Sequence, residues 1–424
     1  MLPFASFRSL LGIRDFRRYY LGQTMSVFGD SLTPLAIAFA VLELTGSPGA
    51  LGLVVLSSRL PMILLSLLGG AVGDRVSRRQ VMLITDCVRF LSQGVTAALL
   101  LTGHASIWAI AVLQLVAGAG SAFFNPAAQG LVASLVPKDK LTEANSLLGI
   151  SRSTGQILAL GLSGALVATA GSGWSILIDA FTFAVSAYFL FRLPRTLAAE
   201  RLERRKGLLG SVGQGLAAVR TRGWLCVWIL HVSLANMIVI SPTVVLGPFI
   251  ADKFLGGAPS WSAIGICYAI GGLAGGIVSA RVKPRRPLVA AALWFFAMAP
   301  FPALLALHGW VPLIAAAGLA AGLQQSVYAV LQTTTLQQNV PGELIARASS
   351  VSMLGSLIGA PVGMALAGPA AVQFGARSVL VFATVTVVVI STAALLIPAA
   401  WRLVVSRPEE QPTSEDAAEA KVEA

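Results

Sequence analysis

The composition of this 424-residue chain excludes a soluble globular domain, because 56% of its residues are hydrophobic, only 11% are charged and the mean hydropathy is +0.80. The net charge of +12 does not indicate a nucleic-acid partner, since the Lys and Arg residues lie in short loops between apolar runs. We therefore expect a protein whose main solvent is the lipid bilayer.

Eight long runs of the sequence contain no Asp, Glu, Lys or Arg. A bilayer core takes about 20 apolar residues per helix, so the longest of these runs hold two helices each. The runs are 44–58, 90–137, 153–178, 223–251, 254–280, 287–342, 348–376 and 378–401.

These runs predict about twelve membrane-spanning helices, six on each side of one extended polar segment. In chain order they are 19–44, 50–73, 80–102, 106–133, 143–170, 174–193, 222–250, 259–281, 287–307, 310–337, 345–371 and 377–402. We expect an all-α membrane protein with a six-helix bundle at 1–193, a cytoplasmic linker at 194–221, a second six-helix bundle at 222–402 and a disordered acidic tail at 403–424.

Basic residues collect in alternate turns between the predicted helices, and this bias sets the orientation of the chain. If the N-terminus is cytoplasmic, the cytoplasmic turns hold most of the Lys and Arg, whereas the opposite turns hold only Lys253 and Arg377. The sequence thus predicts a multi-pass protein of the cell inner (cytoplasmic) membrane with both termini in the cytoplasm.

The two predicted halves share a weak internal repeat at a constant offset of 204 residues. At this offset Val136, Pro137, Asp139, Leu141 and Ala144 meet Val340, Pro341, Glu343, Ile345 and Ala348. A parallel duplication of six-helix units is one of the recognised builds of secondary transporters.

The loop after the second predicted helix, GGAVGDRVSRRQVML at 69–83, is dense in charge. It resembles the loop signature of the major facilitator superfamily, which is a glycine, three residues, Asp-Arg, a small residue and two basic residues. The matching residues are Gly70, Asp74, Arg75, Ser77, Arg78 and Arg79, with Ser77 standing where the family usually has glycine. The resemblance implies a latch that holds the two halves together in the outward-facing state. The alternative is a topological anchor that only obeys the positive-inside rule.

Asp86 and Arg89 lie three residues apart on one face of the third predicted helix, close to its cytoplasmic end. We assign them to the same latch network, and a purely local structural pair is the alternative. Segments FGDSL, TDCVRF and NPAAQGLVASLVPKDKLTEANSL look most like the branch of the superfamily that holds drug, macrolide and siderophore exporters, including enterobactin-exporter-like proteins. That resemblance covers about residues 10–402.

Ionisable groups at membrane depth are costly unless they are paired or face water, so each is a candidate functional residue. Asp30, near the middle of the first helix, is the candidate for proton coupling, and a permanent structural ion pair is the alternative. Arg59 and Arg152 sit at similar depth and are expected to pair with Asp30 or to bind an anionic part of the substrate. Asp179 is expected near the outer surface, facing water.

Enzymatic and ATP-driven functions have no support in the sequence, which carries no Walker loop, metal-ligand cluster or nucleophile elbow. We expect no cofactor, with the proton gradient as the energy source, and a monomer whose partners are a small-molecule substrate and membrane lipids. The predicted function is proton-coupled export of a lipophilic or amphipathic molecule by alternating access. The alternatives are a lysophospholipid flippase on the same fold and uptake of a metabolite.

Overall fold

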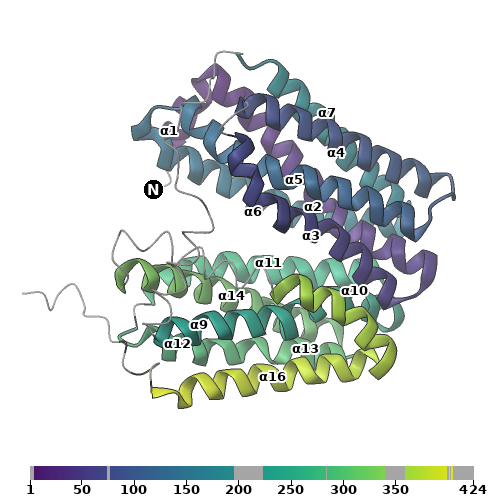
Figure 1. Cartoon of the computed structure of the whole chain (residues 1–424), viewed down its shortest axis with the longest axis vertical. Helices are drawn as coiled ribbons and strands as arrows, with labels where there is room; N and C mark the ends of the chain where they lie inside the picture. The colour runs from purple at the N-terminus through teal and green to yellow at the C-terminus, as the bar shows by residue number, and fades with distance from the viewer. Residues whose placement is uncertain are drawn as a thin grey trace, which may run out of the picture.

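The computed structural model describes residues 4–73, 77–194, 223–282, 284–339, 359–398, 401 and 403. Throughout these residues the regular structure is helical and contains no strand. Figure 1 shows the helices in two groups, one formed by α1 to α7 and the other by the helices from α9 onward. The all-α architecture predicted from the apolar runs is confirmed.

The first group begins with a short helix that precedes the first long one. Its helices are α1 (Phe4–Gly12), α2 (Arg14–Thr45), α3 (Pro48–Gly73), α4 (Arg78–Leu101), α5 (Ile107–Leu135), the 3₁₀ turn η1 (Lys138–Lys140), α6 (Leu141–Thr169) and α7 (Ser172–Phe191). The turns have local causes. Ser77 and Ser106 accept backbone hydrogen bonds as the N-caps of α4 and α5, and Gly46 ends α2 in the left-handed conformation.

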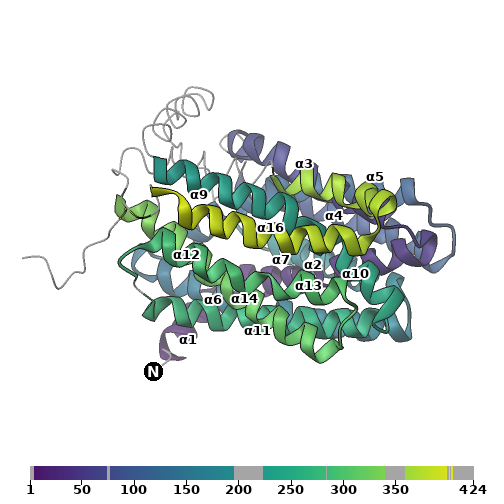
Figure 2. The same cartoon turned by 90° about the horizontal axis from the view of Figure 1, so that it is seen from below.

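Two of the spans in the second group are interrupted by other helix types. The elements are α9 (Gly223–Leu234), the π-helix η2 (Ala235–Ile240), α10 (Ser241–Phe254), α11 (Ala258–Arg281), α12 (Pro287–Phe295), the 3₁₀ turn η3 (Phe296–Met298), α13 (Pro300–Ala306), α14 (Val311–Asn339), a helix over 359–374 and α16 (Ala376–Leu396). Figure 2 shows α9 and α16 side by side along one face of this group.

Nine helical segments of the described chain are long and apolar enough to cross a bilayer. Two more helices, α3 with 26 residues and α6 with 29, also reach the length that a crossing needs. The bounds expected for the two halves, 1–193 and 222–402, stay a prediction. Most of the predicted linker and tail lies outside the described residues.

The apolar core shows where the two groups of helices pack together. One cluster joins first-half residues such as Leu42 and Leu51 to second-half residues such as Leu246 and Ile250. A second cluster, which includes Met82, belongs to the first group alone. In Figure 1 the two groups accordingly come together near α10 and lie further apart toward α1.

Glycine makes this joint between the halves possible. A Cβ atom on Gly368 would lie 2.7 Å from both the Cα of Gly49 and the carbonyl oxygen of Pro48, so any side chain here would push α3 away. On a second pair of helices, the hydroxyl of Ser262 on α11 donates a 2.6 Å hydrogen bond to the carbonyl of Leu160 on α6. Backbone contacts of this kind hold the halves together at one end of the molecule.

Candidate functional site

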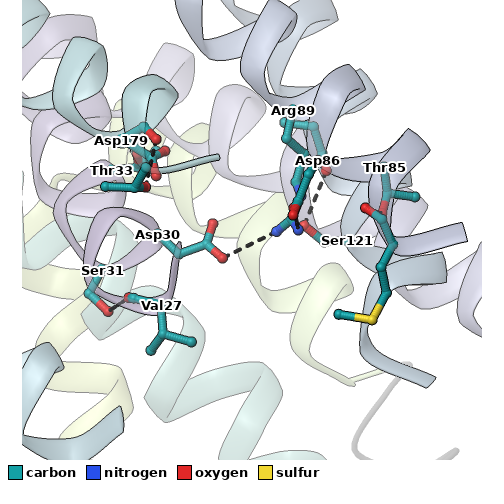
Figure 3. Close-up of polar contacts among 12 residues, drawn as sticks. Val27, Asp30, Ser31, Thr33, Thr85, Asp86, Arg89, Ser121 and Asp179 are labelled. Atoms are coloured by element: carbon teal, nitrogen blue, oxygen red, sulfur yellow. Dashed lines mark hydrogen bonds and ion pairs between the residues drawn. The ribbon is translucent and has the colours of Figure 1, made fainter. Parts of the chain in front are cut away.

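Arg89 is the centre of a charged network inside the first half (Figure 3). Its guanidinium lies 2.5 Å from a carboxylate oxygen of Asp86 and 3.3 Å from one of Asp30. The Cζ atom also lies 4.1 Å from the ring centroid of Phe124 and 4.3 Å from that of Phe183, on α5 and α7. Two carboxylates and two aromatic faces thus compensate a cation that is only 3% exposed.

Asp30 differs from the rest of the network in being accessible. It lies 16 residues after the start of α2, a rise of about 24 Å, which places it at the middle of the helix. Its side chain is nevertheless 47% exposed, whereas those of Arg89 and Asp86 are 3% and 0% exposed. A carboxylate that is anchored to a buried cation and also accessible from outside can exchange a proton.

Asp179 on α7 is fully buried, and the expectation that it faces water near the outer surface is wrong. The Thr33 hydroxyl donates a 2.6 Å hydrogen bond to its Oδ2. A Cβ atom on Gly29 would collide with Thr182 and would lie 2.7 Å from Oδ1 of Asp179, so α7 packs directly on the turn of α2 that carries Asp30. The missed signal is the polar spacing of Asp179, Thr182 and Ser186, which share one helix face.

Arg59 and Arg152, expected as partners of Asp30, make no ion pair with it in the described structure. Both side chains are exposed, on α3 and α6. They attract the Asp30 carboxylate only from further away than Arg89 does. The direct partner of Asp30 is Arg89, which we expected to belong to the latch network. Helix packing, and not depth in the membrane, decides which arginine side chain reaches Asp30.

The loop assigned to the latch is described only in part, because Asp74 and Arg75 lie outside the described residues and Gly70 lies near the end of α3. Arg78 donates a 2.7 Å hydrogen bond to the carbonyl of Gly130 on α5. Arg79 is buried and donates to two carbonyls at the end of α7, those of Leu190 at 2.8 Å and Phe191 at 2.6 Å. These bonds fasten the start of α4 to its neighbours within the first half, and the role of the loop between the halves stays a prediction.

His231 in the second half and Gln114 in the first half each link two helices. Nδ1 of His231 lies 2.8 Å from the hydroxyl of Tyr328, which links α9 to α14. In the first half Gln114 donates to Gln93 across α5 and α4 at 3.0 Å. The described part of the second half has no network comparable to that around Arg89.

The whole chain can be compared with known proteins. The model of the Major Facilitator Superfamily matches residues 19–264 and 260–424. The chain belongs to this superfamily. It is a multi-pass membrane protein and a transporter, not an enzyme.

Several curated members of the superfamily resemble it along most of their length. An uncharacterized MFS-type transporter, YfiS of Bacillus subtilis, is 28% identical over 81% of this chain and 85% of the relative. The multidrug efflux pump Tap of Mycolicibacterium fortuitum is 25% identical, with 87% and 92% covered. The macrolide efflux protein A of Streptococcus pyogenes is 24% identical, with 85% and 90% covered.

Solved structures of the superfamily share the fold. A point mutant of the nucleoside transporter NupG superposes with a TM-score of 0.76 at 12% identity, covering 90% of this chain and 99% of that one. A bacterial homologue of the iron transporter ferroportin in the inward-facing state gives 0.73 at 18% identity, covering 92% and 99%. The expectation of a major facilitator fold is therefore confirmed.

Proposed function

We propose that the protein is a proton-coupled exporter of lipophilic or amphipathic small molecules that works by alternating access between its two halves. The observation that carries the proposal is Asp30, an accessible carboxylate at the middle of α2 that is anchored to a buried arginine. A group in this position can take up a proton from one side of the membrane and release it on the other once the halves move. Loss of its charge on protonation would weaken its contact with Arg89.

The surface around Asp30 suits an amphipathic substrate. α2 is largely enclosed by its neighbours, yet Asp30 and Pro34 are exposed one helical turn apart, and the partly exposed Val27 lies one turn before Asp30 on the same side. Apolar side chains beside a carboxylate can contact a lipophilic body while the carboxylate binds a polar or cationic group. The names of two relatives, a multidrug efflux pump and a macrolide efflux protein, support export as the direction.

We further propose that the protein acts as a monomer in the inner membrane with both termini in the cytoplasm, and that the proton gradient is its energy source. The distribution of Lys and Arg between alternate loops supports the orientation. The predicted spans contain few amide and charged groups, which favours this function over uptake of a polar metabolite.

The test is efflux of a panel of antibiotics, dyes and siderophores from cells that express the chain, with and without a protonophore. Export of one or more lipophilic compounds that stops when the protonophore is added supports the proposal. Reconstituted protein that moves a fluorescent lysophospholipid between leaflets but exports none of the panel would favour the flippase. Accumulation of a polar compound in the cells would favour uptake.

A further inference from the structure

We propose that Asp179 is a second proton-binding residue, which holds a proton in this conformation and shares it with Asp30 during transport. The assignment rests on the proposed function only for its role in the transport cycle. The bound proton itself follows from burial, hydrogen bonding and charge.

The first argument is the isolation of the Asp179 carboxyl. The side chain is 0% exposed and forms no ion pair within the described part of the chain. Its Oδ2 accepts the hydroxyl of Thr33, whereas its Oδ1 is buried with no hydrogen-bond partner among the described residues. A carboxylate with one neutral donor and no cation is poorly compensated, so the neutral acid is favoured at this place.

The second argument is the charge of the surrounding network. Within the described structure, the charged groups that act on Asp179 are Asp30 from α2 and Asp86 and Arg89 from α4. Three ionised carboxylates would face a single guanidinium, and Arg89 already contacts the other two. Asp30 repels an ionised Asp179 while Arg89 attracts it, and Arg89 is already bound to both Asp30 and Asp86. With all three carboxyls ionised the network would carry a net charge of −2, so binding of a proton by one of them is favoured.

The third argument is position. Thr33, which binds Asp179, lies one helical turn after Asp30 on α2, and Gly29 lets α7 pack against the same turn. Asp30 is anchored by Arg89 and Asp179 is not, so Asp179 is the member that holds the proton here. When Asp30 takes up a proton, Arg89 loses one of its two anions and can compensate an ionised Asp179 instead. The proton then lies on Asp30 instead of Asp179, so the network holds one proton in both states and the accessible Asp30 can release it.

The test is infrared spectroscopy of the purified wild-type protein, which detects the C=O stretching band of a protonated carboxylic acid without requiring transport. We expect such a band in the wild type, its loss in Asp179→Asn and its persistence in the control Asp15→Asn, whose pair with Arg18 is partly exposed. Asp30→Asn imitates the neutral acid and frees Arg89 for an ionised Asp179, so it should weaken the band. An Asn side chain has the shape of the neutral acid, so the variant should fold. A wild-type spectrum identical in this region to that of Asp179→Asn would overturn the assignment.

A second variant tests the same band without altering the carboxyl. Thr33→Val removes the hydroxyl that donates to Oδ2 and should shift the band to higher frequency. Ser31→Ala is the matched control, because the Ser31 hydroxyl donates to the carbonyl of Val27 in its own helix, and it should leave the band in place. A band that does not move in Thr33→Val would contradict the assignment to Asp179. If no compound is exported but the band behaves as expected, only the proposed function fails.

Discussion

Arg89 and Asp30 lie 3.3 Å apart and come from opposite environments, since the arginine side chain is 3% exposed and the aspartate side chain is 47% exposed. The pair therefore joins the packed interior of the first half to a surface that solvent or substrate can reach. A change of charge on Asp30 alters its ion pair with Arg89 directly, and Arg89 also forms an ion pair with the buried Asp86. In the proposed mechanism, protonation of Asp30 at the surface would change the packing around Arg89 inside the bundle.

Asp30→Asn should abolish gradient-driven efflux while the protein still inserts into the membrane, because the amide keeps the shape and removes the titrating group. Efflux in the presence and absence of a protonophore and the amount of protein in the membrane measure the two effects. Asp15→Asn on the same helix is the control, since its 3.2 Å pair with Arg18 is partly exposed and contributes little. Wild-type efflux by Asp30→Asn would remove Asp30 from the mechanism.

Arg89→Ala should destabilise the protein by about 3–5 kcal/mol, because it leaves Asp86 buried without its cation. Thermal unfolding of the purified protein measures the loss, and the exposed Arg17→Ala is the control. The double variant Asp86→Asn with Arg89→Met should recover part of the stability, since it removes both charges. An Arg89→Ala protein as stable as the wild type would show that the network is not compensated as described.

Arg78→Ala should slow turnover without greatly weakening substrate binding, because a latch changes the populations of the two conformations rather than contacting the substrate. Transport kinetics in proteoliposomes separate kcat from KM. Arg79→Ala should instead lower the melting temperature, since this buried side chain donates to the carbonyls of Leu190 and Phe191. A change of substrate selectivity in Arg78→Ala with intact turnover would place the loop in the binding site.

Gly368→Val should shift the protein away from the conformation described here, because its side chain would meet the backbone of Pro48 and Gly49 where the halves join. Distances between spin labels at the exposed positions 44 and 372 report the separation of the halves, in a background without Cys87, Cys226 and Cys267. Gly276→Val is the control, since a Cβ atom there meets nothing within 4 Å. Equal label distances in the Gly368 and Gly276 variants would refute this account of the joint.

The sequence by itself determined the helical architecture and the family. These properties follow from local features: the length of an apolar run, the distribution of charge along the chain and a short loop motif. Asp30 could also be identified as a candidate, because its distance from the start of an apolar run gives its depth in the membrane.

Only the tertiary structure decided which arginine contacts Asp30 and where Asp179 lies. The sequence gives only the depth of a residue along its helix, and Arg59 and Arg152 lie at a depth similar to that of Asp30. A contact also depends on how each helix is rotated and on which helices are its neighbours. The close packing of α7 on α2 at Gly29 buries Asp179 beside the turn of α2 that carries Asp30. The direction in which a side chain faces is fixed by contacts between segments far apart in the chain, which no single apolar run contains.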